Sequence, residues 1–196
     1  MNYIKLIFKA LKRLVSEELY ISPENAVKRY RKKGVIIGEN TELYNTKIDN
    51  LRPFLVEIGK NTLITGTRIL THDASTKKAL GYTKVGRVKI GDNVFIGVNS
   101  IILPNIKIGN NVIIGAGTIV SKSIPDNSVV VGNPMKIIGT FEENIKKNIE
   151  NIKISPIFKI NYQISEEEKI KMRNELNEKV GFVVVEDEIR RLKNEV

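Results

Sequence analysis

His72 is the only histidine of the chain, and it lies in the segment LTHDASTKKALGYTKVGR at residues 70–87. An imidazole is partly neutral near pH 7 and can take a proton from a hydroxyl, so His72 is the candidate general base. A neutral imidazole needs an acceptor at its second nitrogen, which fixes the tautomer. Asp73 is the neighbour in sequence, but adjacent side chains of an extended chain point to opposite sides. Asp73 therefore either orients His72 across a bend or structures the loop, and Asp49 or a backbone carbonyl is the alternative acceptor.

The composition excludes several classes of site. The chain has 196 residues, no Cys and one His, so disulfides, thiol nucleophiles and metal sites built from two or three imidazoles are excluded. We therefore expect no metal. The formal net charge of +10 favours anionic partners. The chain contains no Trp and no recognised nucleic-acid motif, so we expect no nucleic-acid partner.

A six-residue repeat surrounds the histidine segment and must position it. An aliphatic residue recurs at every sixth position in Ile90, Ile96, Ile102, Ile108, Ile114 and Val120, and the same phase occurs earlier at Ile58, Ile64 and Leu70. Neither a helix nor simple alternation has this period. The repeat predicts a parallel β-helix in which three units close one coil, so that Ile90 stacks on Ile108 and Ile96 on Ile114. Between Leu70 and Val88 the phase is lost, and we expect a functional loop there.

The repeat divides the chain into three parts: an N-terminal helical segment at 1–33, a β-helix at 34–140 and a mainly helical extension at 141–196. Residues 1–15 have the spacing of an amphipathic basic helix, which packs on the protein or makes a peripheral contact with the inner membrane surface. No signal peptide or transmembrane segment is evident, so we expect a cytoplasmic protein. Further helices are expected at 26–33, at 141–154, from the capping box at Ser165 to Gly181, and at 186–196. Residues 182–185 form a short apolar run.

The chain resembles the hexapeptide-repeat acyltransferases, in particular the galactoside and maltose acetyltransferases and the O-acetyltransferases of surface polysaccharides. The resemblance rests on RPFLVEIG at 52–59, RILTHDAS at 68–75, the repeat itself and IPDNSVVVGNPMKII at 124–138. It implies a mainly β fold, a left-handed parallel β-helix with helical extensions at both ends. It also implies a homotrimer that uses acetyl-CoA as its co-substrate.

The resemblance also assigns roles to individual residues. It implies that His72 deprotonates the acceptor for direct transfer, and it places Asn45 near the acceptor, although Asn45 is equally well a coil-corner residue. The implied acetyl-CoA contacts are Val98, Ala116, Ser121, Lys122 and Lys136. Val98 replaces a serine of the galactoside branch, and Gly139 stands where that branch has an arginine.

The implied function is O-acetylation of a sugar hydroxyl in a surface polysaccharide or its precursor. The alternative is N-acetylation of an amino sugar on a nucleotide carrier. A third hypothesis is acylation from an acyl carrier protein, because an enzyme of that kind would have the same fold and the same base.

Overall fold

The computed structural model describes residues 21–160 and 164–185, and the chain divides into two compact units, Met1–Phe141 and Glu142–Val196. The helices expected at 1–15 and 186–196 lie outside the described residues. The first unit contains the repeat and His72, and the second unit contains most of the C-terminal extension.

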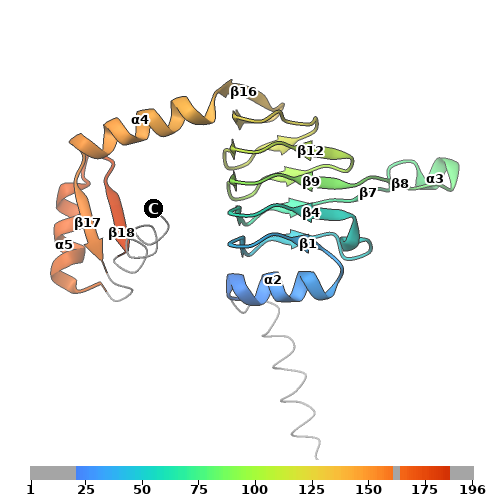
Figure 1. The fold of residues 1–196 in the computed structure, drawn as a ribbon, viewed down its shortest axis with the longest axis horizontal. Helices are drawn as coiled ribbons and strands as arrows, with labels where there is room; N and C mark the ends of the chain where they lie inside the picture. Colours follow the sequence, from blue (N-terminus) through green and yellow to red (C-terminus); the bar gives the residue numbers. More distant parts are fainter. Residues whose placement is uncertain (1–20, 161–163, 186–196) are drawn as a thin grey trace, which may run out of the picture. The chain divides into compact units, whose positions relative to one another are not determined.

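The first unit is a stack of coils made of very short strands (Figure 1). The first sheet contains β1 (Ile36–Ile37), β4 (Val56–Ile58), β9 (Val88–Ile90) and β12 (Ile106–Ile108). The second sheet contains β2 (Glu42–Tyr44), β5 (Leu63–Thr65), β10 (Val94–Ile96), β13 (Val112–Ile114), β15 (Ser128–Val131) and β16 (Lys136–Gly139). The third sheet contains β3 (Lys47–Ile48), β6 (Arg68–Ile69), β11 (Ile101–Ile102) and β14 (Ile119–Val120). The pairing within the three sheets is parallel, except that β16 is antiparallel to β15.

The register of these sheets confirms the predicted stacking. Ile90 is in register with Ile108, and Ile96 is in register with Ile114. The inward aliphatic side chains are at most 1% exposed at Ile58, Ile64, Ile69, Ile90, Ile96, Ile102, Ile108 and Ile114. Burying each such side chain stabilises the fold by about 1.5–3 kcal/mol before entropic costs. The fold of this unit is the left-handed parallel β-helix that the resemblance implied.

One detail of the expected phase is wrong. The six-residue spacing predicts Leu70 in the inward column, but the inward residue of that coil is Ile69. Ile69 is in register with Ile102 and fully buried, whereas Leu70 is half-buried. The same shortening occurs one coil earlier, where Ile48 follows Leu43 after five positions. The corner before the third sheet is therefore one residue shorter in these two coils than in the later ones.

The coil corners explain the many asparagines of the chain. Asparagine tolerates the left-handed backbone region better than other residues with a side chain, so it suits a tight bend that recurs in every coil. Asn40 donates to Asn61 (3.3 Å) and Asn93 donates to Asn111 (3.1 Å), so the side chains also bond along the stack. Eight asparagines have a positive φ: Asn40, Asn45, Asn61, Asn93, Asn99, Asn105, Asn111 and Asn127.

A short helix, α2 (Pro23–Lys32), closes the first coil. Ser22 caps its N-terminus, so the helix begins a turn earlier than the expected residue 26. The buried Tyr30 hydroxyl donates to the Thr46 carbonyl oxygen (3.0 Å) and accepts from the Ile48 N–H (3.1 Å). Arg31 donates to the carbonyl oxygens of Ile37 and Gly38. The helix thus satisfies polar groups that the open end of a solenoid leaves unpaired.

The second unit combines helices with two strands. Helix α4 (Phe141–Ile154) has the expected bounds. Helix α5 (Glu166–Glu175) begins at the expected capping box on Ser165 but ends near Leu176, short of Gly181. The apolar run at 182–185 is β18 (Phe182–Val185), which pairs in parallel with β17 (Ile157–Ile160), a strand that the sequence analysis did not anticipate. Every helix in residues 21–160 and 164–185 is too short or too polar to cross a membrane.

Candidate active site

The loop that interrupts the repeat is an ordered arm at the end of the third sheet (Figure 1). Strand β7 (His72–Asp73) pairs antiparallel with β8 (Lys84–Val85), and α3 (Lys77–Leu80) lies between them. The Gly86 N–H donates to the Thr71 carbonyl oxygen (2.9 Å), which closes the base of the arm. His72 is the first residue beyond this closure, so the coil itself fixes its backbone.

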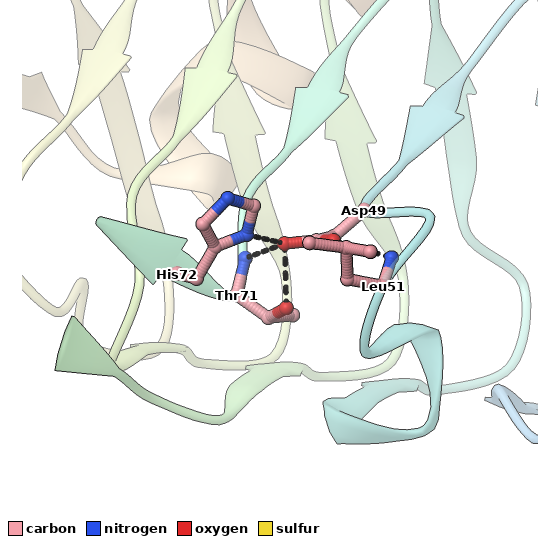
Figure 2. A network of polar contacts seen from close by, with 4 residues as sticks. All are labelled: Asp49, Leu51, Thr71 and His72. Atoms are coloured by element: carbon pink, nitrogen blue, oxygen red, sulfur yellow. Dashed lines mark hydrogen bonds and ion pairs between the residues drawn. The ribbon is translucent and has the colours of Figure 1, made fainter. Parts of the chain in front are cut away.

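His72 contacts Asp49 directly: its Nδ1 meets Oδ2 of Asp49, which directly follows β3 (Figure 2). The Asp49 side chain is 2% exposed, whereas that of His72 is 29% exposed. Oδ2 of Asp49 also accepts from the Thr71 N–H (3.1 Å) and from the Thr71 hydroxyl (2.8 Å), and Oδ1 accepts from the Leu51 N–H (2.9 Å). The carboxylate is thus held by donors from two successive coils.

These donors set the charge of Asp49. Burial alone would raise the pKa of this carboxyl, but the hydrogen bonds from Thr71, His72 and Leu51 outweigh it and hold the pKa well below its usual range. An ionised carboxylate can only accept, so the proton between the two groups belongs to Nδ1 of His72. The lone pair of a neutral His72 is then on Nε2, which points away from Asp49 in Figure 2. This arrangement is suited to taking a proton at Nε2.

Asp73, the other expected acid, makes its contacts within the arm. Its Oδ1 accepts from the Ser75 N–H (2.8 Å), and its Oδ2 lies 3.6 Å from Lys84 Nζ on the paired strand. The backbone hydrogen bond from Ser75, followed by smaller contributions that include the Lys84 charge, lowers the pKa of Asp73. Of the acceptors left open by the sequence, the structure brings Asp49 to His72, while Asp73 braces the arm.

Asn45 lies at the opposite end of the third sheet from His72. It is exposed, has a φ of 47° and belongs to the set of corner asparagines. The geometry therefore accounts for an asparagine at this position through the bend of the backbone. A role for Asn45 toward an acceptor remains a prediction.

The expected donor-site residues fall into two groups. Val98 and Ala116 are exposed at the same corner as Asn45, where the Gly117 N–H donates to the Val98 carbonyl oxygen (2.8 Å). Gly117 has a φ of 70°, and a Cβ there would meet nothing within 4 Å, so the backbone at this corner is open to a ligand. The exposed Ser121 and Lys122 follow β14, at the end of the sheet where His72 lies.

Lys136, the remaining expected contact, is exposed at the start of β16. Two exposed lysines and an open glycine corner are compatible with a long phosphate-bearing ligand such as acetyl-CoA. The described residues contain no group of three or more His, Cys, Asp or Glu side chains that could hold a metal ion.

Thr71 is the site residue that the sequence analysis missed. Its backbone and its hydroxyl both donate to Asp49, and its side chain is fully buried. A threonine before a histidine is not a distinctive signal. Only the stacking of the third sheet shows that Thr71 lies over Asp49 of the preceding coil.

Comparisons with known proteins agree with this fold. Residues 87–122 match the bacterial transferase hexapeptide family (six repeats). Protein CapG of Staphylococcus aureus is 39% identical over 181 residues, which cover 89% of this chain and 96% of CapG.

A galactoside acetyltransferase solved in complex with coenzyme A is 27% identical with a TM-score of 0.51, over 68% of this chain and 64% of that one. A hexapeptide-repeat acetyltransferase of Vibrio cholerae, complexed with acetyl coenzyme A, is 25% identical with a TM-score of 0.50, over 56% of this chain and 61% of that one. The chain thus spans just under two thirds of the length of each of these two structures. With the coiled repeat, the interrupting arm and a relative matched over nearly its whole length, the chain belongs to the bacterial hexapeptide-repeat acyltransferase family.

Proposed function

We propose that the protein is an acetyl-CoA-dependent O-acetyltransferase that acts on a sugar hydroxyl of a surface polysaccharide or its precursor. The observation that carries this proposal is the contact between the buried Asp49 carboxylate and Nδ1 of His72, which leaves Nε2 as a proton acceptor. A transfer of this kind requires such a base near neutral pH. We also propose that the enzyme works in the cytoplasm.

His72 and Asp49 have distinct roles in the proposed mechanism. His72 accepts the proton of the acceptor hydroxyl at Nε2 while the oxygen attacks, and Asp49 stabilises the positive charge that then forms on the ring. Thr71 holds Asp49 in place through two hydrogen bonds. When bound, acetyl-CoA supplies an acetyl group activated as a thioester. As the new C–O bond forms, the C–S bond of the thioester breaks, and His72 can give the proton it has taken up to the leaving coenzyme A thiolate, so the base is regenerated.

The donor site is proposed to form between subunits of a homotrimer. Val98 and Ala116 lie at one end of the third sheet, and His72 lies at the other. The two positions are on different corners of the coil, separated by one side of up to roughly 20 Å, whereas direct transfer needs the thioester in contact with the acceptor held at His72. A neighbouring copy can place its Val98 corner against His72. Lys122 and Lys136 then supply point charges for phosphates.

The relatives support the choice of substrate class. The galactoside acetyltransferase structure, by its name, acts on a sugar and was solved with coenzyme A bound. The Vibrio cholerae acetyltransferase was solved with acetyl coenzyme A. The match to CapG extends into the C-terminal extension, because it covers 89% of this chain.

The test combines binding, assembly and product analysis. Acetyl-CoA above its dissociation constant should raise the Tm of the protein, and no shift would contradict the acetyl-CoA-dependent reading. Light scattering should give about three times the subunit mass of 22.1 kDa, and a fully active monomer would contradict the shared site. Hydroxylamine treatment of the acetylated product separates ester from amide: cleavage supports O-acetylation, and resistance indicates N-acetylation of an amino sugar.

A further inference from the structure

The outward face of the third sheet has two cations side by side and no acid. Lys47 of β3 and Arg68 of β6 are in register, both exposed, with their inward neighbours Ile48 and Ile69 buried. Neighbouring strands lie about 4.8 Å apart, so the two side chains project from adjacent positions on the same face. Neither cation has an ion pair or a hydrogen bond through its side chain among the described residues.

The first sheet contains a comparable pair of cations that does have an acid beside it. There Lys89 and Lys107 are also in register, but Glu57 occupies the next strand and its Oε1 lies 2.9 Å from Lys89 Nζ. Like charges directly opposite each other on a sheet are unfavourable unless an opposite charge compensates them. The strands of the third sheet contain no acid, and their other outward residues are isoleucines, Ile101 and Ile119. No acid on the strands of the third sheet therefore compensates the Lys47–Arg68 pair, and the nearby Asp49 carboxylate contacts His72.

The pair is close to the candidate base along both coils. Lys47 precedes Asp49 by two residues on β3 and its continuation, and Arg68 precedes His72 by four residues on the next coil. Four residues of extended chain span at most about 14 Å. A ligand held at the pair can therefore extend toward Nε2 of His72 along the same sheet.

We propose that Lys47 and Arg68 form an anion-binding subsite for the acceptor, one that takes a carboxylate or a phosphate. This inference rests on the proposed function and narrows its substrate class to acidic acceptors. Arg68 offers the planar fork that binds both groups in a bidentate manner, and Lys47 adds a point charge beside it. A carboxylate would come from an acidic sugar, and a phosphate would come from a nucleotide or lipid carrier of the sugar.

The test measures binding by ligand-observed NMR rather than turnover. The probes are D-glucuronate and D-glucose, which differ in the carboxylate, and glucose 1-phosphate for the phosphate. The variants are Arg68→Gln, the double variant Lys47→Gln/Arg68→Gln, and Lys107→Gln as the matched control on the first sheet. We expect an anionic probe to bind the wild type more tightly than glucose. Arg68→Gln should weaken that binding by roughly tenfold, more salt should weaken it as well, and Lys107→Gln should leave it unchanged.

The outcomes decide whether Lys47 and Arg68 bind an anion. If glucuronate alone binds more tightly than glucose, the ligand is an acidic sugar, and if glucose 1-phosphate alone does, the ligand is a phosphate carrier. Either result supports the subsite. Equal binding of glucose and both anions, or unchanged binding in the double variant, overturns it. A double variant that changes its mass in light scattering shows instead that the pair belongs to a contact between copies. The Tm shift with acetyl-CoA is measured on the same samples. A protein that does not bind acetyl-CoA is therefore distinguished from one that binds acetyl-CoA but lacks the anion subsite.

Discussion

Asp49 and His72 are 23 positions apart in the sequence, yet the buried carboxylate of one contacts the half-exposed ring of the other. The contact exists because β3 and β6 are neighbours in the third sheet, so the residues that follow them meet at one corner. Thr71 adds two further hydrogen bonds to the same carboxylate oxygen. A regular coil of short strands thus supplies a rigid support for a side chain that begins an irregular arm.

Replacing the base should abolish most of the activity without unfolding the protein. His72→Gln keeps much of the size and hydrogen-bonding capacity of the side chain but cannot accept the proton. We expect acetyl transfer to fall by about 10²–10⁴-fold, with the Tm shift produced by acetyl-CoA preserved. Steady-state kinetics on the acceptor check the first expectation, and near-wild-type turnover would refute base catalysis by His72.

The two acids near His72 should behave differently when each is replaced by alanine. In untagged protein His72 is the only histidine, so its ring nitrogens give the only imidazole signals in a ¹⁵N spectrum. The neutral ring should be the Nδ1–H tautomer in the wild type and in Asp73→Ala, but Asp49→Ala should move it toward Nε2–H. The kcat of Asp49→Ala should fall between about tenfold and 10⁴-fold, with the KM for acetyl-CoA little changed.

A second variant keeps this prediction testable if Asp49→Ala folds poorly. Removing the carboxylate leaves buried donors on Thr71 and Leu51 without a partner, which costs about 1–3 kcal/mol each. Asp49→Asn retains one acceptor oxygen for these donors, so it should still fold when the protein is produced and assayed at a lower temperature. Its kcat should lie between those of the wild type and Asp49→Ala. An unchanged kcat and an unchanged tautomer in both variants would leave Asp49 with a structural role alone.

The sequence singled out His72 as the candidate base but left open which acid contacts it, for a physical reason. His72 stands out because it is unique and lies where the repeat stops. The choice between Asp49 and Asp73 depends on how the coils stack at one corner and on where the arm bends. The number of residues between the groups determines neither. The hydrogen bond from Ser75 and the ion pair with Lys84 then engage Asp73 within the arm.

The β-helix itself was predictable because its period is strict. The registers of Ile90 with Ile108 and of Ile96 with Ile114 follow directly from the six-residue spacing. The period misplaced Leu70, because the first two coils have a shorter corner before the third sheet. It also carried no information about the second unit, where the apolar residues of β17 have no repeat to identify them.

The corrected phase makes a stability prediction about two adjacent residues. Ile69 is fully buried in the column with Ile48 and Ile102, so Ile69→Ala should lower the free energy of unfolding by about 2–5 kcal/mol. Leu70 is half-buried, so Leu70→Ala should cost less than half as much. Urea unfolding of the two variants measures both values. A larger loss in Leu70→Ala would restore the phase expected from the sequence.

The low pKa of Asp49 gives the protein a defined sensitivity to acid. The folded state holds the pKa of Asp49 below that of an unfolded aspartate, which is about 3.9. The stabilisation from this carboxylate is therefore fully present above that pH, and it is lost as the pH falls toward the folded pKa. We expect the stability difference between the wild type and Asp49→Asn to shrink as the pH falls from about 4 to about 2. Denaturant unfolding across this range tests the sign, and a difference that grows over the same range would contradict the ionised carboxylate.

Reversing the charge of Lys122 should weaken the donor interaction specifically. Lys122 is exposed at the end of the third sheet where His72 lies, so Lys122→Glu removes no packing and should leave the Tm of the free protein nearly unchanged. In the proposed site it places a negative charge beside the phosphates of acetyl-CoA, and the Tm shift at a fixed acetyl-CoA concentration should fall. Lys60→Glu makes the same change of net charge at the corner between β4 and β5, which is a different corner of the coil from that of Lys122. If both variants reduce the shift equally, the effect comes from the overall charge of the protein and Lys122 is an ordinary surface lysine. If Lys122→Glu alone reduces it, and added salt narrows the gap to the wild type, the phosphates bind at the corner where Lys122 lies.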